Sequence, residues 1–385
     1  MKAQRRVFIL AAIVVLAAAP AAQAQLAVTS NDNKVMLDNG TVKIVQNPAP
    51  DTVTILDLTV SPPRVVAEIA VPGSVVGPPL SVALTPDESL ALVGSSSKVD
   101  PGDPTKTVPD TRVSVIDLKA SPPAVIATLE AGRSAAGISI NRRGTLALVA
   151  NRSEGTVSVF SISGKTVTPV GKVTIADEKS GTSHAVFTPD GTMALVTRDG
   201  DHKISVLSVD GTKVEYTKRD INAGLRPYGI DVSSKGDFAA VANIGIGQGD
   251  TDTVSLIDVR AKPPRVVETV SVGQTPEGIK VSPDGRHVAV VVMNGSNKAK
   301  ESPFYGDSGR LVVLRAKGMK LTKVVEAPIG HWSQGAAFSP DGKTILVGNM
   351  VEKDVQVFSF DGRSLKEVGR IKVNGGPAAV RTAEK

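Results

Sequence analysis

The chain has no cysteine and few aromatic residues, and both scarcities restrict what it can be. Without cysteine among its 385 residues, it cannot form a disulfide, attach a c-type haem or use a thiol as a nucleophile or lipid anchor. Phe, Trp and Tyr make up only 3% of the sequence, so the position of the single tryptophan is informative. Stability must come from a hydrophobic core, which a chain of this length is able to build.

Long apolar runs are also scarce, and the one that exists lies at the start of the sequence. Residues 1–24 combine Lys2, Arg5 and Arg6 with an apolar stretch and a small-x-small ending, which is typical of a secretory signal peptide. A retained anchor is the alternative, although the apolar part is shorter than the roughly 20 residues that a spanning helix needs. The adjacent arginines leave ordinary and twin-arginine export open. We therefore expect a periplasmic or secreted protein, and no membrane insertion once the signal is removed.

The mature chain has only a small excess of positive charge. The full sequence has 44 Lys and Arg against 38 Asp and Glu. The signal contains three of the basic residues, which leaves 41 against 38. Because nucleic-acid-binding domains carry a clustered basic surface, we expect no nucleic-acid partner.

What the sequence does contain is a repeat of about 50 residues. A stretch with alternating apolar residues recurs seven times, as in VTILDL, VSVIDL and VSLIDV, starting at residues 53, 113, 157, 204, 254, 311 and 355. A Pro-Asp-Gly turn followed by β-branched residues recurs too, as in SPDGRHVAVVV (282–292) and SPDGKTILVGN (339–349). Each repeat divides into four short runs with strand composition, and helical spacing is nearly absent.

A four-stranded unit of this size cannot bury both of its faces alone, whereas packing such units radially buries them. We therefore expect an all-β, seven-bladed β-propeller of four-stranded antiparallel blades over residues 25–385, with a sandwich or a solenoid as the alternatives. Gly285 and Gly342 should supply the positive φ of their turns. Four third-strand residues should occupy equivalent positions and face the cores between blades: Val115, Val159, Val206 and Leu256.

Either end of the mature chain could complete the ring. Residues 33–47 resemble the first two strands of a unit, and residues 375–382 resemble a first strand. One of these segments should pair with the opposite end of the chain and remove the open edges.

The Gly-x-x-x-SPDG pattern, a strand ending in Asn and a TVSVID-like strand together resemble the YVTN-type seven-bladed propeller repeat proteins. This group is related to the lactonase-like propellers. The resemblance covers nearly the whole mature chain, with LVAN (148–151), AVAN (240–243) and LVGN (346–349) in place of the tetrapeptide. It implies the propeller fold and a lactonase-like hydrolase or isomerase activity.

Functional residues are expected on one face of the propeller. The Pro-Asp-Gly turns and the Pro-Pro turns at 62–63, 122–123 and 263–264 should share one face, here the Pro-Asp-Gly face. The loops between second and third strands should share the opposite, loop-rich face with the crossings into the next blade. The long insertions at 94–112, 243–253 and 293–310 all belong to the loop-rich face, and long loops often carry binding sites.

The crossings contain the candidate site residues, which should surround the mouth of the central channel. Four are expected to bind a ligand: Arg133, Arg226, Tyr228 and Trp332. Three are candidates for a general base: His184, Glu277 and His331. Ordinary packing at the top of the channel is the alternative.

No metal or cofactor is expected. The glycine-rich stretch 245–249 lacks the spacing of a dinucleotide loop, and the acidic pairs at 250/252 and 100/103 lack the oxygen set that calcium needs. The four histidines form no zinc motif, although pairing of His184 with His331 across the channel stays open.

Two functions follow from the sequence. The first is a monomeric, non-catalytic binding or scaffold protein that holds a protein partner or a small anionic ligand. The second is a lactonase-like enzyme acting on an anionic or carbonyl-bearing small molecule. An accessory role beside a redox enzyme also remains.

Overall fold

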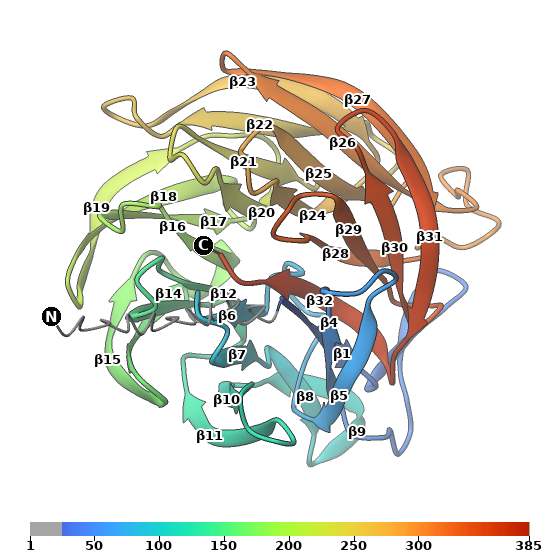
Figure 1. Cartoon of the computed structure of the whole chain (residues 1–385), viewed down its shortest axis with the longest axis horizontal. Coiled ribbons are helices and arrows are strands. Elements are labelled where there is room, and N and C mark those ends of the chain that lie inside the picture. The colour runs from blue at the N-terminus through green and yellow to red at the C-terminus, as the bar shows by residue number, and fades with distance from the viewer. Residues whose placement is uncertain (1–24, 385) are drawn as a thin grey trace, which may run out of the picture.

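The computed structural model describes residues 25–384, which form seven four-stranded antiparallel sheets around a central axis (Figure 1). The predicted seven-bladed propeller is therefore confirmed, whereas the predicted signal peptide lies outside the described residues. Within the described range, the single helical segment is a 3₁₀ turn at Glu178–Ser180, and no helix is long and apolar enough to span a bilayer.

Blades 3 to 7 each follow the chain from the channel outward. Blade 3 comprises β12 (Ala135–Ile140), β13 (Leu146–Asn151), β14 (Thr156–Ser163) and β15 (Thr166–Thr174), and blade 4 comprises β16 (Thr182–Phe187), β17 (Met193–Arg198), β18 (Lys203–Asp210) and β19 (Lys213–Ile221). Blade 5 comprises β20 (Pro227–Val232), β21 (Phe238–Asn243), β22 (Asp252–Asp258) and β23 (Arg265–Gly273), and blade 6 comprises β24 (Pro276–Val281), β25 (His287–Val292), β26 (Gly309–Lys317) and β27 (Lys320–Ile329). Blade 7 comprises β28 (Ser333–Phe338), β29 (Thr344–Asn349), β30 (Asp354–Phe360) and β31 (Leu365–Lys372).

Blades 1 and 2 contain two extra hairpins. Blade 2 comprises β6 (Val82–Leu84), β7 (Leu90–Gly94), β10 (Arg112–Asp117) and β11 (Ala124–Glu130), and blade 1 comprises β32 (Gly376–Thr382), β1 (Leu26–Asp32), β4 (Thr52–Asp57) and β5 (Arg64–Ala70). The extra hairpins are β2 (Val35–Asp38) with β3 (Thr41–Ile44), and β8 (Ser97–Asp100) with β9 (Asp103–Pro109).

The ring closes in blade 1, where β32 supplies the innermost strand and pairs with β1. The prediction that residues 375–382 form a first strand is confirmed. The resemblance of residues 33–47 to two blade strands was misleading, because β2 and β3 form a separate hairpin within the loop from β1 to β4. The physical reason is that β1 already uses both edges, toward β32 and β4, and is buried throughout, whereas β2 and β3 remain largely exposed.

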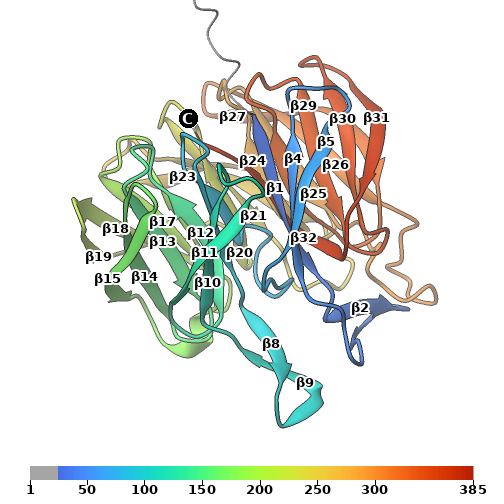
Figure 2. The same ribbon diagram turned by 60° about the horizontal axis from the view of Figure 1, so that its bottom comes forward.

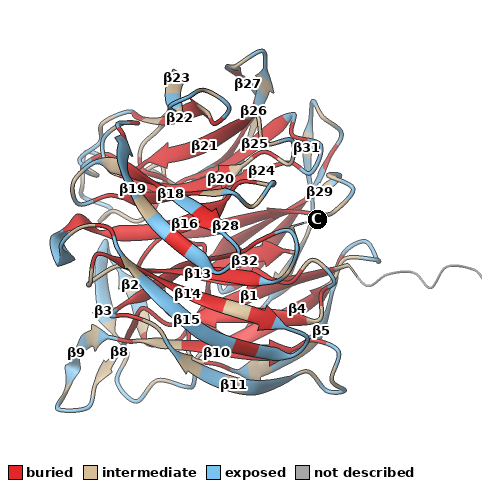
Figure 3. Cartoon of the chain, turned by 90° about the vertical axis from the view of Figure 1, so that its left-hand side faces the viewer, coloured by how far each residue is buried: buried red, intermediate tan, exposed pale blue. Residues whose placement is uncertain are grey.

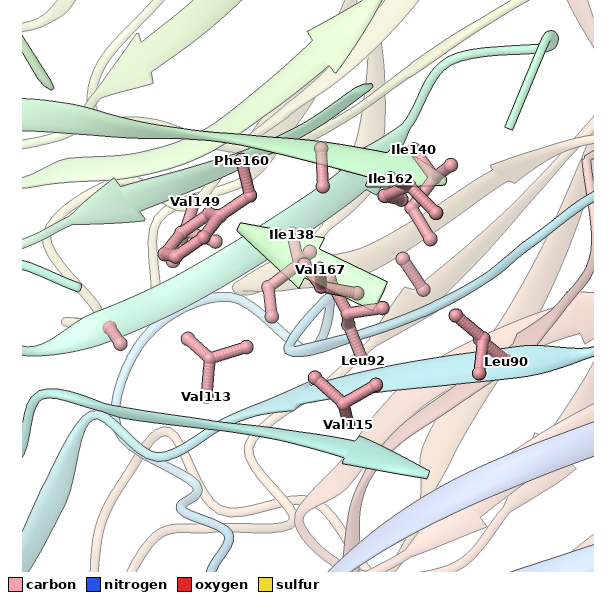
Figure 4. Packing of buried hydrophobic residues seen from close by; sticks show 13 residues of the cluster. Leu90, Leu92, Val113, Val115, Ile138, Ile140, Val149, Phe160, Ile162 and Val167 are labelled. Carbon is pink, nitrogen blue, oxygen red and sulfur yellow. The ribbon is translucent and has the colours of Figure 1, made fainter. Parts of the chain in front are cut away.

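The seven recurring stretches are the third strands of the blades, and they build the cores between neighbours. Val115, Val159, Val206 and Leu256 stand at equivalent positions, each paired with the middle of its second strand. Each belongs to an apolar cluster shared with the next blade, as Figure 4 shows for the cluster of Val115 and Phe160 between blades 2 and 3. The prediction is confirmed. Figure 3 shows the resulting gradient, with buried inner strands and exposed outer strands such as β15 and β19.

The long connections gather on one face, as predicted. Figure 2 shows the β8–β9 hairpin and β2 projecting from the same side of the propeller. Residues 244–251 and 293–308 also connect second to third strands. A fourth insertion, which contains the β2–β3 hairpin, was not recognised in the sequence.

The Pro-Asp-Gly turns have the predicted backbone conformation. Gly285 has a φ of 69° and Gly342 a φ of 71°. In both turns the glycine N–H donates to the carbonyl oxygen of the serine three residues earlier, Ser282 or Ser339, at 2.8 Å. Only glycine takes up this left-handed conformation without a steric cost from Cβ.

Replacing Gly285 by Val should lower the free energy of unfolding by about 1–3 kcal/mol, because a β-branched residue is strained at positive φ. Space is not the cause, since a Cβ at this position would have no neighbour closer than 3.6 Å. The matched control is Gly171→Val, at a strand position with no neighbour within 4 Å and no positive φ. Chemical denaturation of both variants checks this, and equal losses would contradict a conformational origin.

Candidate functional site

The loop-rich mouth of the channel is formed by two sets of equivalent positions in blades 3 to 7. The second residues of the innermost strands are Ala136, Ser183, Tyr228, Glu277 and Gln334. The residues directly after the second strands are Arg152, Asp199, Ile244, Met293 and Met350. A register shift near the start of each of these innermost strands marks a β-bulge, a feature that commonly redirects side chains next to functional sites.

Asp199 is the centre of a charged network at this mouth. Its carboxylate accepts hydrogen bonds from Nη1 of Arg152, from Nη2 of Arg152 at 3.0 Å and from Nη2 of Arg226 at 2.9 Å. The Ser183 hydroxyl lies 2.7 Å from the same carboxylate. Although burial opposes its ionisation, these donors hold the pKa of Asp199 below its usual value. Two guanidinium groups therefore share one carboxylate.

Glu277 lies beside this network and keeps some exposure to the channel. Burial raises its pKa to about 7, while the Gln334 amide and the charges of Arg226 and Arg152 lower it less. At neutral pH this carboxyl group is thus divided between its two protonation states, which is the condition for proton transfer in either direction.

Tyr228 and Gln334 add an aromatic face and an amide. The guanidinium carbon of Arg152 lies 5.5 Å from the centre of the Tyr228 ring, within the range of a cation–π contact. Burial raises the pKa of Tyr228, so its phenol stays protonated. Gln334 is 1% exposed, and its buried amide lies next to the Glu277 carboxyl group.

The other half of the mouth is apolar and covered. Trp332 packs with Met293 and Met350, and Val35 and Leu37 of the β2–β3 hairpin pack against this cluster. The hairpin also reaches the long loop of blade 6, since the Asn39 amide donates to Glu301 at 2.9 Å. Trp332 therefore belongs to a hydrophobic cluster that the β2–β3 hairpin covers, and the sequence had not indicated this cover.

Two predicted site residues lie at the rim instead of joining the network. Arg133 is exposed and forms an ion pair with Glu178 at 3.6 Å. His331 Nδ1 lies 2.7 Å from the Glu352 carboxylate. Local acidic partners engage both side chains, so neither takes part in the charged network. Of the predicted set, the structure brings together Arg226, Tyr228 and Glu277.

His184 is buried in the channel wall and is engaged by the backbone of both neighbouring blades. Its Nδ1 lies 3.0 Å from the Ile230 carbonyl oxygen, and its Nε2 lies 3.4 Å from the Ile138 carbonyl oxygen. Burial, with a smaller contribution from the charge of Arg381, lowers its pKa to about 3. The ring is therefore neutral and completely buried, and these two carbonyls, not His331, face its nitrogens.

The residues that sequence reasoning missed are Arg152, Asp199 and Gln334. Arg152 follows LVAN directly and Asp199 follows LVTR, so both stand at the same position of the repeat. Comparing that position across blades is the signal that would have found them. No group of three or more His, Asp or Glu side chains suited to a metal ion occurs in residues 25–384.

Replacing His184 by Gln should make stability less sensitive to acid. The unfolded imidazole takes up a proton near pH 6.5, whereas the folded one does so only near pH 3. Relative to the variant, the wild type should therefore lose about 1.4 kcal/mol of unfolding free energy per pH unit below 6.5. Urea unfolding between pH about 7.5 and about 5 measures this. A constant difference between the two proteins would show that His184 does not resist protonation.

Comparisons with known proteins agree with the fold. A family model described as "Lactonase, 7-bladed beta-propeller" matches residues 164–314. No curated protein matches the sequence.

Several solved structures share the architecture at low identity. A proposed 6-phosphogluconolactonase from Bacteroides fragilis has a TM-score of 0.71 and 16% identity, covering 95% of this chain and 99% of that one. The periplasmic gluconolactonase of Pseudomonas aeruginosa has a TM-score of 0.69 and 17% identity, covering 94% and 99%. Hydrazine synthase of Kuenenia stuttgartiensis has a TM-score of 0.62 and 19% identity, covering 81% and 91%. The chain is thus a seven-bladed β-propeller that resembles the lactonase-like propellers.

Proposed function

We propose that the loop-rich mouth of the channel binds a small anionic or carbonyl-bearing molecule. The observation that carries the proposal is the sharing of Asp199 by Arg152 and Arg226 next to a carboxyl group, Glu277, with a pKa of about 7. When Glu277 is protonated, these four groups have a net charge of +1. Guanidinium groups form strong, directional hydrogen bonds with carboxylate and carbonyl oxygens.

The neighbouring side chains favour a polar ligand with one less polar face. The Gln334 amide, next to Glu277, has both a donor group and an acceptor, which suit the hydroxyl groups of a sugar acid or a lactone. The Tyr228 ring lies on the same side of the mouth and would contact the less polar face of such a ring. The protein would meet this ligand after export, acting as a monomer, as residues 1–24 and the composition led us to expect.

Lactone hydrolysis is the second candidate function, and Glu277 is the observation that favours it. The Glu277 carboxylate would take a proton from water, and the water oxygen would form a bond with the lactone carbonyl carbon. Arg152 or Arg226 would stabilise the negative charge on the carbonyl oxygen. The ring C–O bond would then break, and Glu277 would return its proton to the departing alkoxide oxygen. The likeness to the Pseudomonas aeruginosa periplasmic gluconolactonase supports this candidate.

Replacing Arg226 by Ala should weaken gluconate binding by about 1.5–3 kcal/mol, the contribution of a hydrogen bond to a charged group. Lys317→Ala, on the Pro-Asp-Gly face at the end of β26, is the matched control and should bind as the wild type does. Isothermal titration calorimetry measures both. Equal effects of the two substitutions, or no binding of gluconate or gluconolactone, would exclude the proposed site for these ligands.

Replacing Glu277 by Gln should lower kcat for glucono-δ-lactone by about 10²–10⁴-fold, the usual contribution of a general base. Because the base must be ionised, the enzymatic rate of the wild type, after subtraction of the spontaneous rate, should increase with pH and reach half of its maximum near pH 7. A pH-stat assay with the Glu215→Gln variant as control measures this, since Glu215 lies on the exposed outer strand β19. Undiminished hydrolysis by the Glu277 variant would show that Glu277 is not the general base, and no hydrolysis by the wild type above the spontaneous rate would leave binding as the function.

A further inference from the structure

A cavity of about 100 Å³ lies at the opposite end of the channel, on the Pro-Asp-Gly face. Its walls are the last residues of innermost strands from five consecutive blades: Ile140, Phe187, Val232, Val281 and Phe338. Prolines of the adjoining turns complete the rim. These five side chains and the prolines give the cavity an apolar belt, beside the polar Thr188, Ser234 and Ser282 of the turns, and nothing in the sequence had pointed to it.

Charged groups lie at one side of this apolar cavity. Lys280, which lines it, is 7% exposed and lies 3.2 Å from Asp231 Oδ1 and 2.9 Å from Glu384 Oε1. Arg381, on strand β32 of blade 1, is 2% exposed and donates through Nη2 to the same Glu384 oxygen. Two buried cations thus converge on one carboxylate oxygen of Glu384.

Arg381 is only partly satisfied by this arrangement. Its Nε and Nη1 are buried and have no hydrogen-bond partner among the described residues. A guanidinium group usually pairs with a carboxylate through two parallel hydrogen bonds, and an unpaired buried donor is costly. Arg381 therefore has donors available to acceptor oxygens in addition to the one that it gives to Glu384.

The balance of charge also depends on Glu384. Without it, Lys280 and Arg381 would face Asp231 alone and leave one uncompensated positive charge in a buried place, which is strongly unfavourable. Glu384 lies two residues beyond the end of β32, and its side chain is 33% exposed. It is the least buried member of the group, so it is the member that another carboxylate can displace.

We propose that the Pro-Asp-Gly end of the channel is a second binding site, for a small organic carboxylate with an apolar body, and that Glu384 occupies its anion position when no ligand is bound. The carboxylate of the ligand pairs with Lys280 and Arg381, and its apolar body contacts the walls formed by Phe187, Val281 and Phe338. This site is independent of the one at the loop-rich mouth.

The test uses hexanoate as the probe, with hexanol for the apolar body alone and acetate for the charge alone. Calorimetry should show that hexanoate binds more tightly than either control. In the Glu384→Gln variant, which loses the competing carboxylate, hexanoate affinity should rise by at least about tenfold. The Glu215→Gln control should leave it unchanged, because that carboxylate lies on the outer strand β19.

Two further measurements locate the site. Trp332, the single tryptophan, packs at the loop-rich mouth, so its fluorescence should stay unchanged when hexanoate fills the opposite end. Arg381→Met should abolish hexanoate binding, with folding checked by circular dichroism. The proposal is overturned if Glu384→Gln leaves the affinity unchanged or lowers it, if hexanol binds as tightly as hexanoate, or if hexanoate changes the Trp332 emission.

Discussion

The pairing of β32 with β1 is the contact on which the rest of the structure depends. Six residue pairs, from Ala27 with Thr382 to Asp32 with Gly376, join the two ends of the chain in one blade. Each blade buries both faces against its neighbours, so an open ring would expose apolar cores on either side of the gap. Closure also fixes the axis, because the innermost strands must then approach one another closely enough to enclose the channel.

That close approach explains where functional side chains are found. The third residue of the innermost strand is Gly137, Gly229, Gly278 or Gly335 in four of blades 3 to 7, and a Cβ there would lie within 2.6 Å of the neighbouring blade. His184 is the exception, and its ring fills the space that Gly137 leaves open. The innermost strands therefore pack closely against one another around His184, and the two proposed sites lie at the ends of the channel.

The sequence predicts the fold better than the site for a physical reason. Blade strands repeat because every interface between blades has the same packing requirement, and this placed Val115 and Leu256 correctly. The residue types of the site differ from blade to blade, so Arg226, Tyr228 and Glu277 were predicted only because they are charged or aromatic residues in the crossings. The same criterion also selected Arg133, which does not join the site. The side chain of Arg133 points to a local partner, Glu178, and no pattern along the chain shows this. Arg152 and Asp199 were missed because the sequence comparison used the crossings into the innermost strands and did not compare the position that directly follows each second strand.

The two ends of the channel balance their buried charges in different ways. Each holds two cations and two carboxyl groups in surroundings where an unbalanced charge is costly. At the loop-rich mouth the adjustable group is Glu277, which reaches neutrality by taking up a proton because its pKa is about 7. At the other end Glu384 stays ionised, since Lys280 and Arg381 outweigh burial and hold its pKa at about 2. The first end can thus change its charge by titration of Glu277 in place, whereas a change at Glu384 requires its carboxylate to move, and this difference is why we propose proton transfer for the first end and exchange of anions for the second.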